Sequence, residues 1–70
     1  MTDTSERLAN RVFDVLRAAD EPLSAGRIQR RLARDGSDAT TGAVRDTCRR
    51  LIDAGEVEAV DDPPAYRITE

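Results

Sequence analysis

The residues of this chain with the clearest chemistry are its arginines, which gather in one segment. Residues 24–52 hold seven arginines and three aspartates, a local net charge of +4, whereas the other residues carry a net charge of −7. A planar guanidinium donates paired hydrogen bonds to phosphate or carboxylate oxygens. Because a polyanion responds to the local field at close range, the overall net charge of −3 does not exclude one as a ligand. The seven residues are Arg27, Arg30, Arg31, Arg34, Arg45, Arg49 and Arg50.

No residue pattern in the chain is typical of catalysis. It has no histidine, no glycine-rich phosphate loop and a single cysteine, Cys48. The turn at residues 35–38 lacks the ligand series and the closing glutamate of a calcium loop. We therefore expect no catalytic residues, no metal and no cofactor, and hence no enzyme. Cys48 falls on a predicted buried stripe, where a cysteine acts as a small hydrophobic residue; a redox role would need an exposed thiol of lowered pKa.

The length of 70 residues predicts one small domain spanning residues 1–70. With no possible internal disulfide and no zinc ligand set, so small a core favours a partner chain. No apolar run approaches the roughly 20 residues that span a bilayer, and no signal-peptide core follows Met1. These features predict a cytoplasmic protein with no membrane partner. Arginine without lysine, and more aspartate than glutamate, suggest a GC-rich genome and a halophile's acid-coated surface.

Hydrophobic periodicity predicts a first helix over residues 5–19, with Asp3 or Thr4 as its cap and Pro22 beyond its end. Its apolar stripe consists of Leu8, Val12, Val15, Leu16 and Ala19. A second helix is predicted over residues 25–34, from the cap residue Ser24 to a stop at Gly36. Its apolar face holds Ala25, Ile28 and Leu32. At 100° per residue, its arginines lie on the opposite face, with Arg31 on the flank.

A third helix is predicted over residues 41–54, ending at Gly55. Its buried stripe is expected to consist of Val44, Cys48, Leu51 and Ile52. Its outward residues are Gly42, Asp46, Arg49 and Asp53, with Arg45 and Arg50 on either side. The period then changes to two, which predicts a β-hairpin over about residues 56–69 with a turn at residues 61–64. The expected fold class is α+β and mostly helical.

The ordered set of these segments resembles the winged helix-turn-helix regulators of the MarR and ArsR type. The resemblance extends from Leu8 to Thr69. It rests on Pro22-Leu23-Ser24-Ala25, the helix end Leu51-Ile52-Asp53-Ala54-Gly55 and the closing Ala65-Tyr66-Arg67-Ile68-Thr69. It implies three helices with a hairpin wing, the third helix lying in the DNA major groove, and sequence-specific binding of double-stranded DNA by a transcriptional regulator.

The resemblance also implies roles for individual residues. The residues that it implies for base readout are Thr41, Gly42, Arg45, Asp46 and Arg49. Those that it implies for phosphate contacts are Arg27, Arg30, Arg31, Arg34, Arg50 and Arg67. A homodimer is implied, with Phe13 and Ala9 as a possible dimer contact; the alternative is that these two side chains widen the core face of the first helix.

Two features depart from the pattern of these regulators. The expected wing tip, Asp61-Asp62-Pro63-Pro64, is acidic where DNA-binding wings are usually basic. The loop at residues 35–40 is longer than the 3–4-residue turn of a compact helix-turn-helix. Three alternatives therefore stay open: the arginines form only a solvated face, the domain is a protein-interaction module without DNA binding, or it is a replication or control factor of a virus or plasmid.

Overall fold

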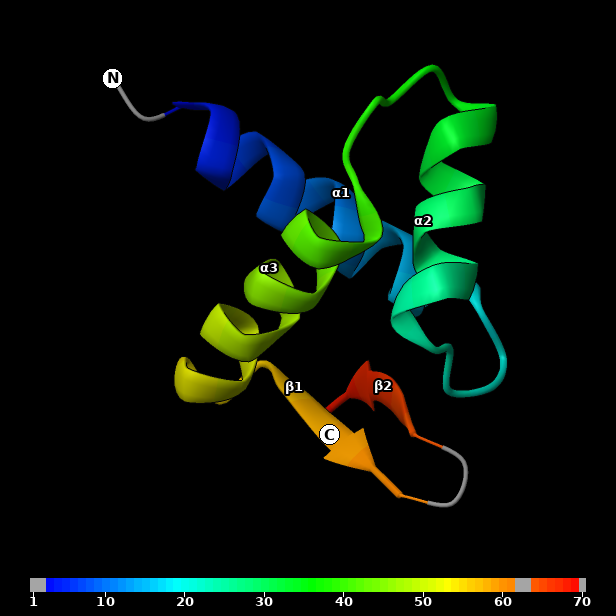
Figure 1. The fold of residues 1–70 in the computed structure, drawn as a ribbon. Helices are drawn as coiled ribbons and strands as arrows, with labels where there is room; N and C mark the ends of the chain where they lie inside the picture. Colours follow the sequence, from blue (N-terminus) through cyan, green and yellow to red (C-terminus); the bar gives the residue numbers. More distant parts are fainter. Residues whose placement is uncertain (1–2, 62–63, 70) are drawn as a thin grey trace.

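Three helices followed by an antiparallel hairpin make up the computed structural model, which describes residues 3–61 and 64–69 (Figure 1). This order confirms the predicted α+β, mostly helical fold. The elements are α1 (Asp3–Ala18), α2 (Ala25–Arg34), α3 (Thr41–Asp53), β1 (Val57–Val60) and β2 (Ala65–Ile68). None of the helices in the described ranges is long and apolar enough to cross a membrane.

The helix boundaries follow the prediction closely except at the start of α1. This helix already includes Asp3 and Thr4, so the expectation that one of them caps it from outside is wrong. It ends at Ala18 rather than Ala19, although the Ala19 amide still donates to the Val15 carbonyl at 3.1 Å. Helix α3 ends at Asp53, and Ala54 is its C-cap. Shifts of one or two residues are the usual uncertainty of a helix end, because terminal turns are incompletely hydrogen-bonded.

Side-chain caps and left-handed glycines define the ends of α2 and α3. The Ser24 hydroxyl accepts from the Arg27 amide at 3.3 Å, and the Thr40 hydroxyl accepts from the Ala43 amide at 3.1 Å. Gly36 and Gly55 follow the two helices with φ of 91° and 78°, a conformation that costs other residues a steric penalty. The predicted roles of Ser24, Gly36 and Gly55 are confirmed.

The core lies where the three helices and the hairpin meet, and most of the predicted stripe residues line it. Its buried residues include Val12, Leu16, Leu23, Ile28, Leu32, Val44, Cys48, Leu51 and Val57. On α3 the stripe differs at two positions, since Ile52 is half-buried and Thr47 is buried instead. The Thr47 hydroxyl donates to the Ala43 carbonyl at 2.8 Å, which satisfies its polar atom inside the core.

The hairpin lies where it was expected, but burial does not alternate along its strands, since Ala65 is buried while Ala59 is exposed. The hairpin also gains one pairing that periodicity did not reveal. Val57 lies opposite Ile68 and Ala59 opposite Tyr66, so these four residues share one face, although Ala59 is exposed. The Leu23 amide donates to the Tyr66 carbonyl at 3.0 Å, and the Tyr66 amide donates to the Leu23 carbonyl at 2.8 Å. The joint between α1 and α2 is thereby attached to β2. Of the expected tip, Asp62 and Pro63 lie outside the described residues.

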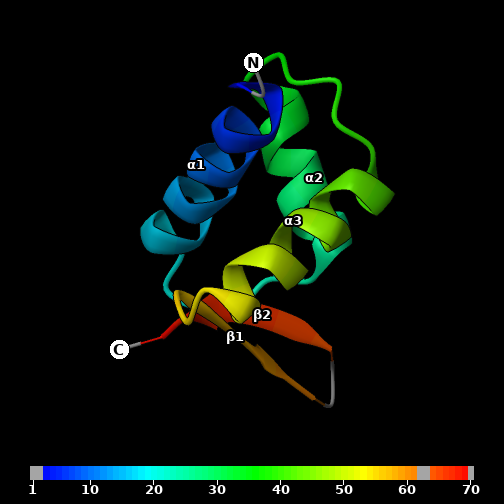
Figure 2. The ribbon, with the colours of Figure 1, turned by 90° about the vertical axis from the view of Figure 1, so that its left-hand side faces the viewer.

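The hairpin lies beside the carboxyl end of α3, as both views of the ribbon show (Figures 1 and 2). Helix α1 packs against both α2 and α3. The hairpin packs against α3, and the Leu23 bridge attaches the start of α2 to β2. The faces of α2 and α3 opposite their buried stripes are exposed to solvent.

Candidate nucleic-acid interface

Helix α2 presents an exposed face on which every charged residue is an arginine. Its ten residues contain four arginines and no acidic residue, and Ala25, Ile28 and Leu32 are its buried side. All four arginines are exposed: Arg27, Arg30, Arg31 and Arg34. Because residues three and four apart are neighbours on a helix surface, these side chains form one continuous row along α2.

Helix α3 exposes three further arginines on the surface opposite its buried stripe. Arg45 and Arg49 are four residues apart and lie on the same side, while Arg50 lies on the other flank with Asp46. Gly42 is exposed one turn before Arg45, whereas Thr41 is half-buried. Four of the five predicted base-reading residues are therefore exposed on α3, and Thr41 is the least accessible of them.

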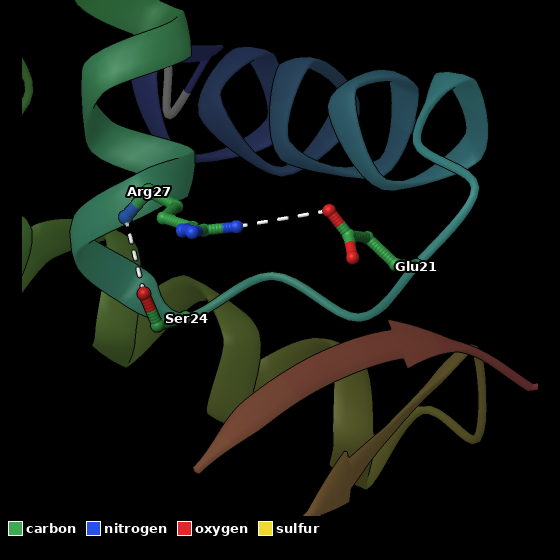
Figure 3. A network of polar contacts seen from close by, with 3 residues as sticks. All are labelled: Glu21, Ser24 and Arg27. Atoms are coloured by element: carbon green, nitrogen blue, oxygen red, sulfur yellow. Dashed lines mark hydrogen bonds and ion pairs between the residues drawn. The ribbon is translucent and has the colours of Figure 1, made fainter. Parts of the chain in front are cut away.

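Among the described residues, two arginines form an ion pair with a carboxylate. An Arg27 Nη1 lies 3.7 Å from a Glu21 Oε2 (Figure 3). The Nε of Arg67 donates to Glu58, its cross-strand neighbour on the hairpin. Among residues 3–61 and 64–69, the other six arginines predicted to contact DNA have no carboxylate within 4.0 Å. These six, which we call the open arginines, are Arg30, Arg31, Arg34, Arg45, Arg49 and Arg50.

Because Arg67 is paired with Glu58, its guanidinium is less available to bind a polyanion at the hairpin. Arg67 and Glu58 form the ion pair, and Asp61 at the end of β1 is exposed. The described part of the hairpin therefore carries more carboxylates than free guanidinium groups on its exposed surface. Among the arginines predicted to contact DNA, those without a carboxylate partner in the described residues therefore lie on α2 and α3.

The loop at residues 35–40, which sets the start of α3, is held in place by side-chain hydrogen bonds. Gln29 Nε2 donates to the Ala39 carbonyl at 3.4 Å, and the Ser37 hydroxyl accepts from the Ala39 amide at 3.2 Å. The Ser37 amide itself donates to the Leu32 carbonyl at 3.0 Å. The loop is therefore tied to α2 despite its length. The sequence prediction assigned no role to Gln29. The available signal was that Gln29 is an uncharged amide in a helix whose other polar side chains are arginines.

Phe13 and Ala9, the predicted dimer contact, are half-buried and pack against the core. Their contacts agree with the alternative that they widen the core face of α1. The exposed remainder of each side chain leaves the dimer contact a prediction.

Cys48 has no accessible thiol. It is fully buried, and desolvation by burial raises its pKa from 9.0 to about 11. The reactive form of cysteine is the thiolate, which is scarce at neutral pH when the pKa is raised. Cys48 therefore serves as a small hydrophobic residue of the core. The part of the chain that the structure describes contains no group of three or more side chains suited to hold a metal ion.

Comparison of the chain with models of protein families, with characterised proteins and with solved structures gave no match.

Proposed function

We propose that this domain binds double-stranded DNA through the exposed faces of α2 and α3 and acts as a transcriptional regulator of the winged-helix kind. The observation that carries the proposal is the set of open arginines. Six exposed guanidinium groups without a carboxylate partner in residues 3–61 and 64–69 lie on two helices that pack against each other. Retaining so many unneutralised cations in a chain of net charge −3 favours a polyanionic ligand.

The two helices would make different kinds of contact with DNA. The row on α2 suits phosphate oxygens, which supply affinity and register but carry no sequence information. Helix α3 fits the major groove, about 12 Å wide, where Arg45 and Arg49 would each donate two hydrogen bonds to a guanine edge. Asp46 would accept from a cytosine amino group or orient a neighbouring arginine, and the exposed Gly42 would allow close approach.

A homodimer would place two copies of α3 on one face of the duplex. Two-fold-related recognition helices contact half-sites one helical turn apart, roughly 34 Å. The exposed parts of Phe13 and Ala9 on α1 are the proposed contact between the copies. A partner chain would also supplement the small core, which supports this arrangement on grounds of size.

The test compares two double variants of equal charge change. Arg45→Ala/Arg49→Ala removes the proposed base-reading pair, whereas Arg7→Ala/Arg17→Ala removes two exposed arginines of α1. Fluorescence anisotropy with duplexes selected from a random pool should show a loss of affinity and selectivity in the α3 variant, at about 1–3 kcal/mol for each lost guanine contact. The α1 variant should lose much less. Equal behaviour of both variants and the wild type would remove α3 as the reader.

A second candidate is a protein-interaction module, which the described part of the hairpin favours. Its ion-paired Arg67 and exposed Asp61 suit an interface that avoids phosphate. Such docking buries apolar surface and responds weakly to salt, whereas phosphate neutralisation responds steeply. The salt dependence of binding therefore separates the two candidates.

A further inference from the structure

Arg27 differs from the other arginines of α2 because, within residues 3–61 and 64–69, it alone has a carboxylate within 4.0 Å. Glu21 lies in the joint between α1 and α2, and its Oε2 is 3.7 Å from Arg27 Nη1 (Figure 3). The side chains are 65% and 64% exposed for Arg27 and Glu21, so the pair is open to an incoming anion. The Ser24 cap fixes the first turn of α2 and so keeps the base of the Arg27 side chain beside the joint.

The pair lies at one end of the arginine row on α2. Arg30 and Arg31 follow three and four residues later, so an anionic backbone that follows the row reaches Arg27 at its end. The adjacent Gly26 is also exposed. Because the Arg27 side chain is itself exposed, a phosphodiester can approach it, and the group with which the phosphodiester would compete is the Glu21 carboxylate.

We propose that Glu21 is an intramolecular competitor for the phosphate contact of Arg27 and thereby lowers the DNA affinity of the domain. The inference rests on the proposed function, since it concerns the same surface. Binding would exchange a carboxylate–guanidinium pair for a phosphate–guanidinium pair. Exposed ion pairs are weak, so the exchange is easily reversible. Removing the Glu21 carboxylate should therefore raise the DNA affinity by about two- to fivefold.

The experiment measures anisotropy on a random-sequence duplex at fixed low salt. Glu21→Gln removes the competitor, and Asp20→Asn is the matched control because it removes one neighbouring exposed carboxylate that has no ion-pair partner in the described residues. Glu21→Gln should bind about two- to fivefold more tightly than Asp20→Asn. In an Arg27→Ala background this difference should disappear, because the competition requires the guanidinium. Thermal unfolding of each variant confirms that the fold is retained.

Two results would overturn the inference while leaving the proposed function intact. Equal affinities of Glu21→Gln and Asp20→Asn would show that only net charge matters. A gain that persists in the Arg27→Ala background would show that Glu21 acts elsewhere. Absence of duplex binding by both the wild type and Glu21→Gln would refute the proposed function, and the inference with it.

Discussion

Gly42 offers a test in which stability and binding should change in opposite directions. It is the second residue of α3 and is exposed. A Cβ built there would meet only the Thr40 hydroxyl oxygen at 3.9 Å, an ordinary van der Waals contact. Unlike Gly36 and Gly55, Gly42 does not have a positive φ. The fold therefore has no steric need for glycine at this position, although glycine destabilises a helix.

The substitution Gly42→Ala should accordingly stabilise the domain. In a helix interior, alanine is favoured over glycine by roughly 0.5–1 kcal/mol, because glycine loses more backbone entropy on folding; this range is the upper bound for Gly42, which lies in the first turn of α3. In a domain of this size, a gain of about 1 kcal/mol raises the Tm by about 4–8 °C. If α3 enters the major groove at Gly42, the added methyl group should weaken a neighbouring base contact worth about 1–3 kcal/mol. The variant should thus be more stable and bind DNA less tightly.

Thermal unfolding and duplex anisotropy on the same samples measure both quantities. Asn10→Ala is the matched control, since Asn10 is exposed within α1 and its replacement also favours the helix. This control should gain stability and keep the wild-type affinity. A lower Tm for Gly42→Ala would refute the steric reasoning. An unchanged affinity in a stabilised variant would refute the close approach of α3 to DNA.

Two further predictions concern single residues of the fold. Thr40→Ala should lower the free energy of unfolding in urea by about 1 kcal/mol, because the Ala43 amide loses its cap acceptor. The control is Thr69→Ala, at an exposed position after β2. An equal change in both variants would contradict the role of Thr40 as a cap. The stability contributed by the protonated Cys48 should be complete below pH 9 and fall as the pH rises to about 11, since the folded pKa lies above the ordinary value of 9.0. The loss should reach about 2–3 kcal/mol at the upper end and be absent in Cys48→Ala; equal pH profiles of the two proteins would contradict burial as its cause.

Local rules were sufficient to predict much of this fold. Ser24 marks the start of α2 and Gly36 its end because their chemistry acts on amides and dihedral angles nearby in the chain. The exposure of the arginines also follows from helical period, since the apolar residues of α2 and α3 leave only the opposite faces for charge. On α3, the packing of neighbouring elements shifted the buried stripe at Thr47 and Ile52.

Contacts between distant segments could not be predicted in the same way. The pairing of Leu23 with Tyr66 depends on how the hairpin folds back onto the joint between α1 and α2. The Glu21–Arg27 ion pair depends on the path of that joint, and the Gln29–Ala39 hydrogen bond depends on the path of the next loop. Periodicity gives the face on which a side chain lies, whereas its partner is set by the tertiary fold. The candidate interface was therefore predictable as a charged surface, but its internal pairs were not.

The salt dependence of binding to a random-sequence duplex tests the central claim most directly. Each phosphate neutralised contributes about −0.9 to the slope of log K against log salt concentration. With six open arginines available on each bound copy, we expect each copy to contribute between about −3 and −5 to the slope. A slope near zero, or no binding even at low salt, would contradict DNA recognition by α2 and α3.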